Sequence, residues 1–440
     1  MEQRFKEKMS PGLRRVAEAA QRNRGPLLSL AHHIDVEALR RAYNRIRNNA
    51  AVGVDGVTKE EYGEALEENL RDLHSRLKTM RYRHQPIRRV LIDKEGGKKR
   101  PIGVSTIEDK IVQDSLRELL QVIYEQDFLQ CSYGSRPGRS AHDAVRALDA
   151  AAHRGEANWV LEADIVSFFE RIIKSLLKEL LQRRIADKSL MRLIGKCLHV
   201  GVLESGAVMT PETGTVQGSS LSPILANVYL HYALDLWFEE EVKKRLRGRA
   251  ALIRYCDDFV ITFERRDDAE QAHKWVEERL GQYGLELHPE KTRLLDFRRP
   301  SQNDRGKGPG TFDFLGFTIL WRRSGQGRGG WHMTTRTRVL RLRKAKTAIH
   351  DWCRRHRHRP VADQHAALIR KLQGHFNYFG VRGNERSMHL LIRSTERSWH
   401  KWLNRRSQRS RMTWKRFKAV LESFPLPAPK ASKSLWGHAQ

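Results

Sequence analysis

Hydrophobic positions in the first quarter of the chain recur at helical spacing, with one hairpin-like interruption. Asp35 is a good N-cap for a helix over residues 36–49, in which every third or fourth residue is apolar. Further amphipathic helices are expected over about 59–80 and about 107–124. Residues 88–104 alternate as strands do and contain KEGGKK, which predicts a β-hairpin with that turn.

The middle of the chain mixes strand-like and helical segments, whereas its end is almost all helical in pattern. The elements expected after residue 125 are a buried strand at 158–164, a long apolar helix beginning at Ser222 or Pro223, a helix at 267–283, a strand pair at 312–320 and helices from about residue 335 onward. A proline-rich tail follows residue 425. This order predicts an α+β fold followed by an α-helical domain.

Residues 252–263, LIRYCDDFVITF, place two adjacent carboxylates inside an apolar, strand-like run. The β-branched and aromatic residues favour strands, whereas Asp257 and Asp258 suit a two-residue turn. A β-hairpin with both carboxylates at its tip is therefore expected. On this stretch alone two interpretations stay open, an ordinary solvated turn and a functional pair of carboxylates.

The charge of the chain changes this picture. The formal net charge is +30, and residues 321–440 hold 29 lysines and arginines against 5 acidic residues. Seven of the ten tryptophans lie in the same stretch. Because phosphate backbones are the usual partners of such a cationic surface, and aromatics stack on bases, the composition predicts binding to RNA or DNA.

Composition also argues against several other classes of protein. No apolar run approaches the roughly 20 residues that a membrane-spanning helix needs, and the N-terminus lacks the apolar core of a secretory signal. A cytosolic protein without membrane contact is therefore expected. Cys131, Cys197, Cys256 and Cys353 stand far apart with no C-x-x-C pair, so neither a zinc site nor a disulfide framework is expected.

A third carboxylate, Asp164, ends the strand-like run at 158–164. Carboxylates clustered at strand ends repel one another and raise each other's pKa, a penalty that divalent cations remove. Two Mg²⁺ ions about 3.5–4 Å apart would suit phosphoryl transfer. Hard oxygen ligands without histidine or thiol favour Mg²⁺ over zinc, with Mn²⁺ as a possible substitute. The trio therefore predicts a nucleotidyl-transfer site.

A series of sequence blocks follows one another in order over roughly residues 10–425. They are GVDGVT (53–58), KKRPIGVSTIEDKIVQ (98–113), YGSRPGRSAHDAV (133–145), LEADIVSFFERI (161–172), GTVQGSSLSPILANVYL (214–230), LIRYCDDFVITF (252–263), GLELHPEKT (284–292), FLGF (314–317) and WHKWLNRRSQRSRMTWKRF (399–417). In this order they resemble the blocks of reverse transcriptases, and specifically of group II intron-encoded maturases. The resemblance implies a right-hand polymerase with fingers, an antiparallel palm sheet and an α-helical thumb/maturase domain.

The resemblance also implies roles for individual residues. The catalytic residues and metal ligands would be Asp164, Asp257 and Asp258, with the carbonyl of Ile165 as a further ligand. The residues implied to bind the deoxynucleotide are Lys99, Arg100, Phe169, Gln217 and Lys291. Lys99 and Arg100 would hold the triphosphate, Phe169 would lie under the sugar and exclude a 2′-hydroxyl, Gln217 would cover the nucleotide, and Lys291 would neutralise charge. Core packing for Phe169 and a solvated hairpin flank for Lys99 and Arg100 remain the structural alternatives.

Template or intron RNA would be bound by the basic C-terminal helices. The residues expected to contact it are Arg354, Arg355, Lys401, Arg405, Arg406, Lys415 and Arg416. The expected domains are an N-terminal helical extension (1–82), fingers and palm (83–330), the thumb/maturase domain (331–425) and a flexible tail (426–440).

The function implied is that of an RNA-directed DNA polymerase of a group II intron, which also binds intron RNA to assist splicing and mobility in a bacterial cytosol. Its partners would be RNA, a DNA primer or target, and deoxynucleotides. A host-adopted enzyme of phage defence, CRISPR spacer acquisition or DNA repair is the alternative. No endonuclease module is expected. Val216 and Ser219 depart from the proline and glycine usual in their block, and Cys256 stands where alanine is common.

Overall fold

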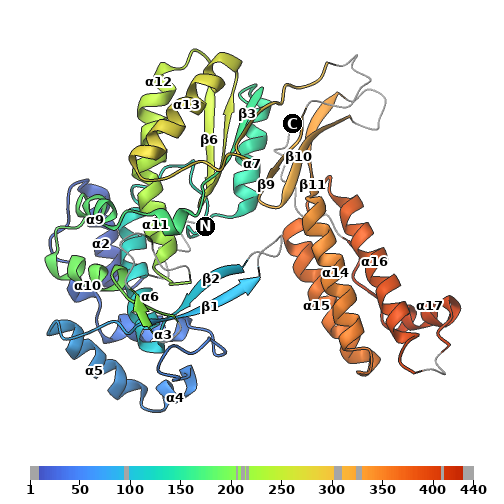
Figure 1. Cartoon of the computed structure of the whole chain (residues 1–440), viewed down its shortest axis with the longest axis horizontal. Coiled ribbons are helices and arrows are strands. Elements are labelled where there is room, and N and C mark those ends of the chain that lie inside the picture. Colours follow the sequence, from blue (N-terminus) through green and yellow to red (C-terminus); the bar gives the residue numbers. More distant parts are fainter. Residues whose placement is uncertain are drawn as a thin grey trace.

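The computed structural model describes residues 9–93, 99–204, 207–209, 214, 218–301, 310–323, 330–407 and 411–429. It consists of an N-terminal group of helices, three β-sheets with their covering helices, and a C-terminal group of helices (Figure 1). Helices and antiparallel strand pairs are therefore mixed, as the sequence predicts. None of the described helices has the length and apolar content that crossing a membrane would require.

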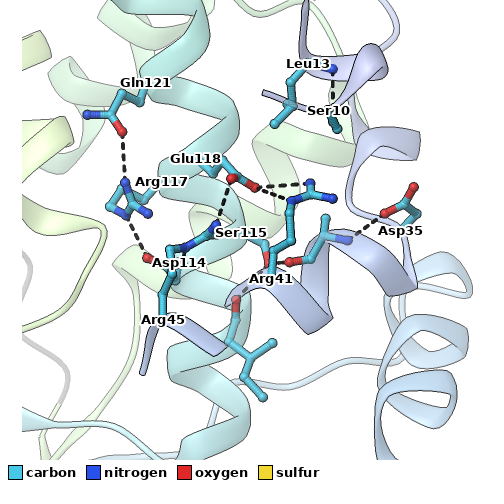
Figure 2. A network of polar contacts seen from close by, with 12 residues as sticks. Ser10, Leu13, Asp35, Arg41, Arg45, Asp114, Ser115, Arg117, Glu118 and Gln121 are labelled. Atoms are coloured by element: carbon cyan, nitrogen blue, oxygen red, sulfur yellow. Dashed lines mark hydrogen bonds and ion pairs between the residues drawn. The ribbon is translucent and has the colours of Figure 1, made fainter. Parts of the chain in front are cut away.

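Helix α6 (Ile107–Tyr124) has the bounds expected from its sequence and is buried along most of its length. The helices gathered around it are α2 (Pro11–Arg22), α3 (Val36–Arg45), α4 (Lys59–Glu64) and α5 (Leu66–Lys78). The N-cap role of Asp35 in α3 is confirmed, because its carboxylate accepts from the N–H of Ala38 at 2.7 Å. Ion pairs join α3 to α6, with Arg45 Nε 2.6 Å from Asp114 Oδ2 (Figure 2).

The single helix expected over 59–80 is wrong, because the chain leaves helical geometry at Ala65. The side-chain amide of Asn69 donates to the carbonyl of Tyr62 at 2.9 Å across this break. A side-chain donor there satisfies a helix-terminal carbonyl, and so the helix can end.

A four-stranded antiparallel sheet, called the central sheet below, has the order β6-β7-β3-β8. Its strands are β6 (Ala250–Tyr255), β7 (Asp258–Phe263), β3 (Trp159–Asp164) and β8 (Arg293–Asp296). One face packs against α13 (Arg266–Gln282) and belongs to the main core, whereas the other packs against α7 (Ala141–His153) and a second core. Alternate residues of β3 and β7 therefore enter different cores.

The predicted hairpin at 88–104 is confirmed as β1 (Ile87–Asp93) paired with β2 (Lys99–Val104). Its expected turn, residues 94–98, lies outside the described residues. Strands β4 (Val202–Glu204) and β5 (Ala207–Met209) extend this sheet in the order β2-β1-β4-β5. The hairpin projects beside α6 in Figure 1.

The long apolar helix expected after Ser222 is confirmed, although its winding changes along its length. It begins as α11 (Ser222–Leu230) and continues through two π-helical segments, His231–Asp235 and Phe238–Val242, into α12 (Lys243–Arg245). Short helices α8 (Phe168–Arg171), α9 (Lys174–Gln182) and α10 (Lys188–Leu198) precede it. A π-helical segment inserts an extra residue per turn and so redirects the side chains that follow.

The third sheet has the order β11-β10-β9, formed by β9 (Phe312–Phe314), β10 (Phe317–Arg323) and β11 (Trp331–Thr337). The strand pair expected at 312–320 is thus confirmed. The helical pattern expected from residue 335 is wrong for its first residues, because 331–337 pair with β10 along its whole length. Helices α14 (Val339–Arg355), α15 (Val361–Phe379), α16 (Glu385–Leu403) and α17 (Trp414–Ser423) follow and share a core of their own.

Candidate active site

Asp164 and Asp258 lie side by side where the two inner strands of the central sheet, β3 and β7, end and begin. Asp164 is the last residue of β3, Asp258 is the first residue of β7, and the two are direct partners in the antiparallel register. Opposite residues of an antiparallel pair send their side chains to the same face, with Cα atoms about 4.5–5.5 Å apart. Strand pairing thus brings together two carboxylates that are distant along the chain.

Asp257 belongs to the turn before β7. The sequence predicts Asp257 and Asp258 as the two turn residues, but the turn consists of Cys256 and Asp257, and Asp258 already pairs with Tyr255. Cys256 has a φ of 56°, in the left-handed backbone region that residues other than glycine seldom adopt. The prediction was therefore shifted by one residue, and one carboxylate belongs to the turn while the other belongs to the strand.

Burial in this arrangement raises the pKa of Asp258 to about 7, and the charges of Asp257, Asp164 and Glu162 act in the same direction. The backbone N–H of Leu315 donates to Asp258 and opposes that shift. Burial also raises the pKa of Asp257. The charge of Asp164 adds to this shift, and those of Arg100 and Arg254 oppose it. A positive charge placed among these carboxylates would therefore be stabilised.

One such positive charge comes from Lys291, whose ammonium group forms an ion pair with Asp164. Lys291 belongs to the turn at residues 289–291. The segment before this turn is joined to the end of β3, where His288 N–H donates to the carbonyl of Asp164 at 2.8 Å and Val166 N–H donates to that of Glu286 at 2.9 Å. Neither bond uses the Ile165 carbonyl. The charge-neutralising role expected for Lys291 stays a prediction, which this ion pair supports.

A cleft of about 980 Å³ opens in front of Asp164 and Asp258. Its lining comprises Glu162, Ala163, Asp164, Asp258, Glu290, Lys291, Arg293, Asp313, Phe314, Leu315, Gly316, Arg338, Arg341, Tyr378 and Phe379. Three parts of the molecule contribute: the central sheet, the β9–β10 turn and the C-terminal helices. The Tyr378 hydroxyl donates to the Leu315 carbonyl at 2.8 Å, which joins α15 to the turn that contacts Asp258.

The residues expected to bind a nucleotide lie on two sides of the carboxylates. Lys99 and Arg100 are exposed on β2, and the charge of Arg100 acts on Asp257. Phe169 is half-buried at the edge of the main core, with its ring 5.3 Å from that of Phe168. Gln217 lies outside the described residues.

Gly214 and Gly218, the nearest described residues on either side of Gln217, both lie close to neighbouring backbone. A Cβ at Gly214 would come within 3.0 Å of Glu170, and one at Gly218 within 2.6 Å of the Gly103 carbonyl oxygen. Gly214 therefore lies against α8, and Gly218 lies against β2.

Six of the seven residues expected to bind RNA are exposed on the C-terminal helices or the segment between them: Arg354, Arg355, Lys401, Arg405, Lys415 and Arg416. Arg406 differs, because it is half-buried and its guanidinium donates to the carbonyls of Arg357, at 2.6 Å, and Arg359. Arg406 thus joins the segment between α14 and α15 to the segment after α16, and its guanidinium is less available to RNA than the other six side chains.

Several residues near the site are absent from the sequence-based set. Arg338, Arg341 and Tyr378 line the cleft from the C-terminal part of the chain, and no motif singles them out. Arg254 and Asp235 lie behind the turn, buried and paired with each other. A single charge inside each of two apolar runs, LIRYC and YALDLWF, was the signal that could have identified this pair.

Within the parts of the chain that the structure describes, no three His, Cys, Asp or Glu side chains are already gathered as a metal-binding cluster. Asp164 and Asp258 face one another, Asp257 is adjacent, and all three offer hard carboxylate oxygens, which suits a divalent ion such as Mg²⁺. The residues fit such an ion.

Comparison with known proteins agrees with this geometry. The model of the family described as reverse transcriptase (RNA-dependent DNA polymerase) matches residues 92–319, just over half of the chain. Protein YkfC of Escherichia coli (strain K12) is 32% identical over 309 residues, covering 62% of this chain and 77% of YkfC. Group II intron-encoded protein LtrA of Lactococcus lactis subsp. cremoris is 28% identical over 345 residues, covering 64% of this chain but only 55% of LtrA.

Nuclear intron maturase 2 of Arabidopsis thaliana is 32% identical over 100 residues, 22% of this chain and 13% of its own length. The resemblance to intron-encoded reverse transcriptases that the sequence blocks suggested is thus confirmed. The matched family model spans β3, the Cys256–Asp257 turn and β7, and so includes all three carboxylates. The chain belongs to the reverse transcriptase family, the RNA-dependent DNA polymerases.

Proposed function

We propose that this chain copies RNA into DNA by nucleotidyl transfer supported by two Mg²⁺ ions, at a site formed by Asp164, Asp257 and Asp258. The observation that carries the proposal is the register pairing of Asp164 with Asp258 at the wall of a cleft with basic residues. Residues 83–330 would form the fingers and palm, with the central sheet as the palm. The C-terminal helices would form the thumb, and residues 1–82 and 426–440 an N-terminal extension and a tail.

The three carboxylates would hold the ions, together with the Ile165 carbonyl. When bound, Mg²⁺ activates the primer 3′-hydroxyl and stabilises the leaving oxygens. The side chains of this protein would orient the reactants. Arg100 would bind the triphosphate in bidentate fashion, with Lys99 beside it. Phe169 would lie under the deoxyribose and Gln217 over the nucleotide, while Lys291 would balance the charge of Asp164 whenever a cation leaves.

The primer–template would occupy the cleft between the central sheet and the C-terminal helices. Arg338 and Arg341 lie on the cleft wall contributed by the C-terminal part, where they would contact phosphates. Tyr378 and Phe379 offer aromatic faces beside them. These positions support a path for nucleic acid that ends at Asp164 and Asp258.

The similarity to LtrA supports a second part of the proposal, namely that the chain binds a group II intron RNA and assists its splicing and mobility. The exposed cations of α14, α16 and α17 would provide the contact. If the DNA flanking the gene encodes such an intron, the protein should lower the Mg²⁺ concentration at which the intron RNA splices. No change in splicing would favour a host-adopted role.

Primer extension on an RNA template tests the polymerase directly. Asp258→Asn and Asp164→Asn keep the shape of each side chain but remove its charge, so both should reduce DNA synthesis to background. RNA binding should remain within about twofold of the parent, because the exposed cations of the C-terminal helices are unchanged. Loss of RNA binding in equal measure would contradict this separation of binding from chemistry, and synthesis at the parent rate would reject the site.

A further inference from the structure

Arg254 is a charged residue with no solvent exposure, located on β6 two positions before the turn residue Cys256. Its partner Asp235 is equally buried, with both side chains at 0% exposure. Placing two charges inside a protein is costly unless every donor and acceptor is satisfied. The pair therefore calls for an explanation beyond ordinary core packing.

All five N–H groups of the Arg254 guanidinium have acceptors. Nε donates to Asp235 Oδ1 at 2.7 Å, and Nη2 donates to the other oxygen of Asp235 and to Ser132 Oγ at 2.9 Å. Nη1 donates to Asn227 Oδ1 at 3.0 Å and to the Cys256 carbonyl at 2.9 Å. The last bond fixes the peptide that joins Cys256 to Asp257.

Gly134 makes a second contact with the same turn. A Cβ at that position would lie 2.4 Å from the backbone nitrogen of Cys256 and 2.5 Å from its Sγ, so the two backbones are in direct contact. Asn227 links the two supports, because its Nδ2 donates to the Gly134 carbonyl at 2.8 Å while its Oδ1 accepts from Arg254. The backbone N–H of Arg254 also donates to the Cys131 carbonyl at 2.8 Å.

The position of Asp235 depends on the π-helical segment His231–Asp235, whose last residue it is. An extra residue in one turn rotates the side chains that follow by about one helical position, and such insertions often occur near functional sites. Here the segment ends with the Asp235 carboxylate facing β6, where it forms two bonds with Arg254. Asn227, eight residues and about two helical turns earlier on α11, reaches the same guanidinium.

We propose that Gly134, Asn227, Asp235 and Arg254, together called the turn clamp, position the carboxylate of Asp257 for catalysis. Arg254 is then a positioning residue that acts through the Cys256 peptide. The left-handed backbone of Cys256 is sparsely populated by side-chain-bearing residues, so the turn keeps this form only while its surroundings impose it. This inference rests on the proposed function, because it assigns the clamp to the same carboxylate site.

Arg254→Lys is the first test. A lysine keeps the positive charge but cannot bind both oxygens of Asp235 and the Cys256 carbonyl in the same planar array. Arg184→Lys is the matched control. Arg184 is also buried, with its side chain 3% exposed. It pairs with Asp127 at 2.7 Å and donates to the Ala20, Asn23 and Gly25 carbonyls, away from the turn.

The measurements are the thermal midpoint, template–primer affinity, the burst amplitude that counts active enzyme, the rate per active enzyme and the Mg²⁺ concentration for half-maximal rate. Arg254→Lys should lower the rate per active enzyme by about 10- to 100-fold, the cost of a displacement on the scale of 1 Å, and should raise the Mg²⁺ requirement. Template–primer affinity should not change. Arg184→Lys should lower only the thermal midpoint.

A parent-like rate per active enzyme and Mg²⁺ requirement in Arg254→Lys would overturn the clamp, as would equal kinetic changes in Arg184→Lys. If Arg254→Lys does not fold, Gly134→Ala decides, since it pushes the turn while leaving the Arg254–Asp235 pair in place. It should reproduce the kinetic changes, and a parent-like rate would reject the clamp. Asp257→Ala separates the two proposals: DNA synthesis at the parent rate in that variant would overturn the proposed site itself.

Discussion

The ammonium group of Lys291 is ion-paired with the carboxylate of Asp164, although the two residues are 127 positions apart in the chain. Lys291 is 55% exposed and Asp164 32% exposed, so solvent weakens the pair. A divalent ion bound by Asp164 would compete with the lysine for the same oxygens. The pair therefore reduces charge repulsion at the site and opposes metal binding at the same time.

Replacing Lys291 by alanine should therefore lower the Mg²⁺ concentration that gives the half-maximal thermal shift. The change should be a factor of about 2 to 5, which corresponds to an exposed ion pair of at most about 1 kcal/mol. Differential scanning fluorimetry over a Mg²⁺ series measures it. Lys178→Ala, an exposed lysine of α9, serves as the control. A higher midpoint for Lys291→Ala would contradict competition.

Phe169→Val should admit ribonucleotides. The smaller side chain leaves space for a 2′-hydroxyl at the position where Phe169 borders the block that contains Gly214. Discrimination between deoxynucleotides and ribonucleotides, measured as the ratio of kcat/KM values, should fall by about tenfold or more. Phe169→Tyr retains the ring and should preserve the ratio. If Phe169→Val discriminates as well as the parent, Phe169 is a core residue and not a steric gate.

Exposed and half-buried cations of the C-terminal helices should differ in their effect on RNA binding. For single-stranded RNA, the double variant Lys415→Ala/Arg416→Ala should reduce the slope of log affinity against log salt by about 1.4, because each phosphate contact contributes about 0.7. Arg406→Ala should change the slope little and lower the thermal midpoint, since Arg406 bonds the carbonyls of Arg357 and Arg359. RNA-binding titrations at four salt concentrations measure the two slopes, and thermal unfolding measures the midpoint. Equal slopes in all three proteins would exclude Lys415 and Arg416 from the contact.

Two histidines make stability depend on pH. Burial lowers the pKa of His231 and of His375 to about 4, and for His231 the charges of Arg254 and Arg136 act in the same direction while Asp235 opposes them. In the unfolded chain both would titrate near 6.5. The unfolded state therefore binds more protons between these values, so the free energy of unfolding is highest above about pH 6.5 and falls as the pH drops towards 4.

Urea unfolding at pH 7, 6 and 5 checks this dependence. His231→Leu should lose less stability than the parent between pH 7 and 5, because one titrating group is gone. His153, whose side chain is 55% exposed, provides the control substitution. A parent and a His231→Leu variant with identical pH slopes would show that His231 is protonated equally in both states.

Much of the fold follows from local patterns. The bounds of α6 and the N-cap of α3 agree with the sequence because capping and apolar periodicity act within a few residues. The turn at Cys256 and Asp257 was misplaced because the left-handed backbone of Cys256 depends on the Arg254 guanidinium, which bonds the Cys256 carbonyl, and on Gly134, which contacts the Cys256 nitrogen. Gly134, and Asp235 that orients the guanidinium, lie outside residues 252–263, so no pattern within that stretch contains their contacts.

Strand β11 was not predicted from the sequence, for a related reason. Residues 331–337 include Thr334, Thr335 and Thr337, which favour strands, but their pairing partner is β10 and the helical pattern of α14 begins directly after them. At the candidate site, motif order identified the three carboxylates. The cleft wall of Arg338, Arg341 and Tyr378 appears only when the C-terminal helices are placed against the β9–β10 turn.

The anchoring of the C-terminal helices has a consequence for protein engineering. Asn384, at the start of α16, accepts from the Thr337 N–H and donates to the Thr337 hydroxyl, both at 2.8 Å, and Arg338 forms an ion pair with Asp313 at 2.8 Å. A chimera that exchanged only residues 339–425 with a related enzyme would cut through these bonds. The exchanged segment should instead start before β9, so that the three-stranded sheet and the helices whose orientation it determines come from the same enzyme.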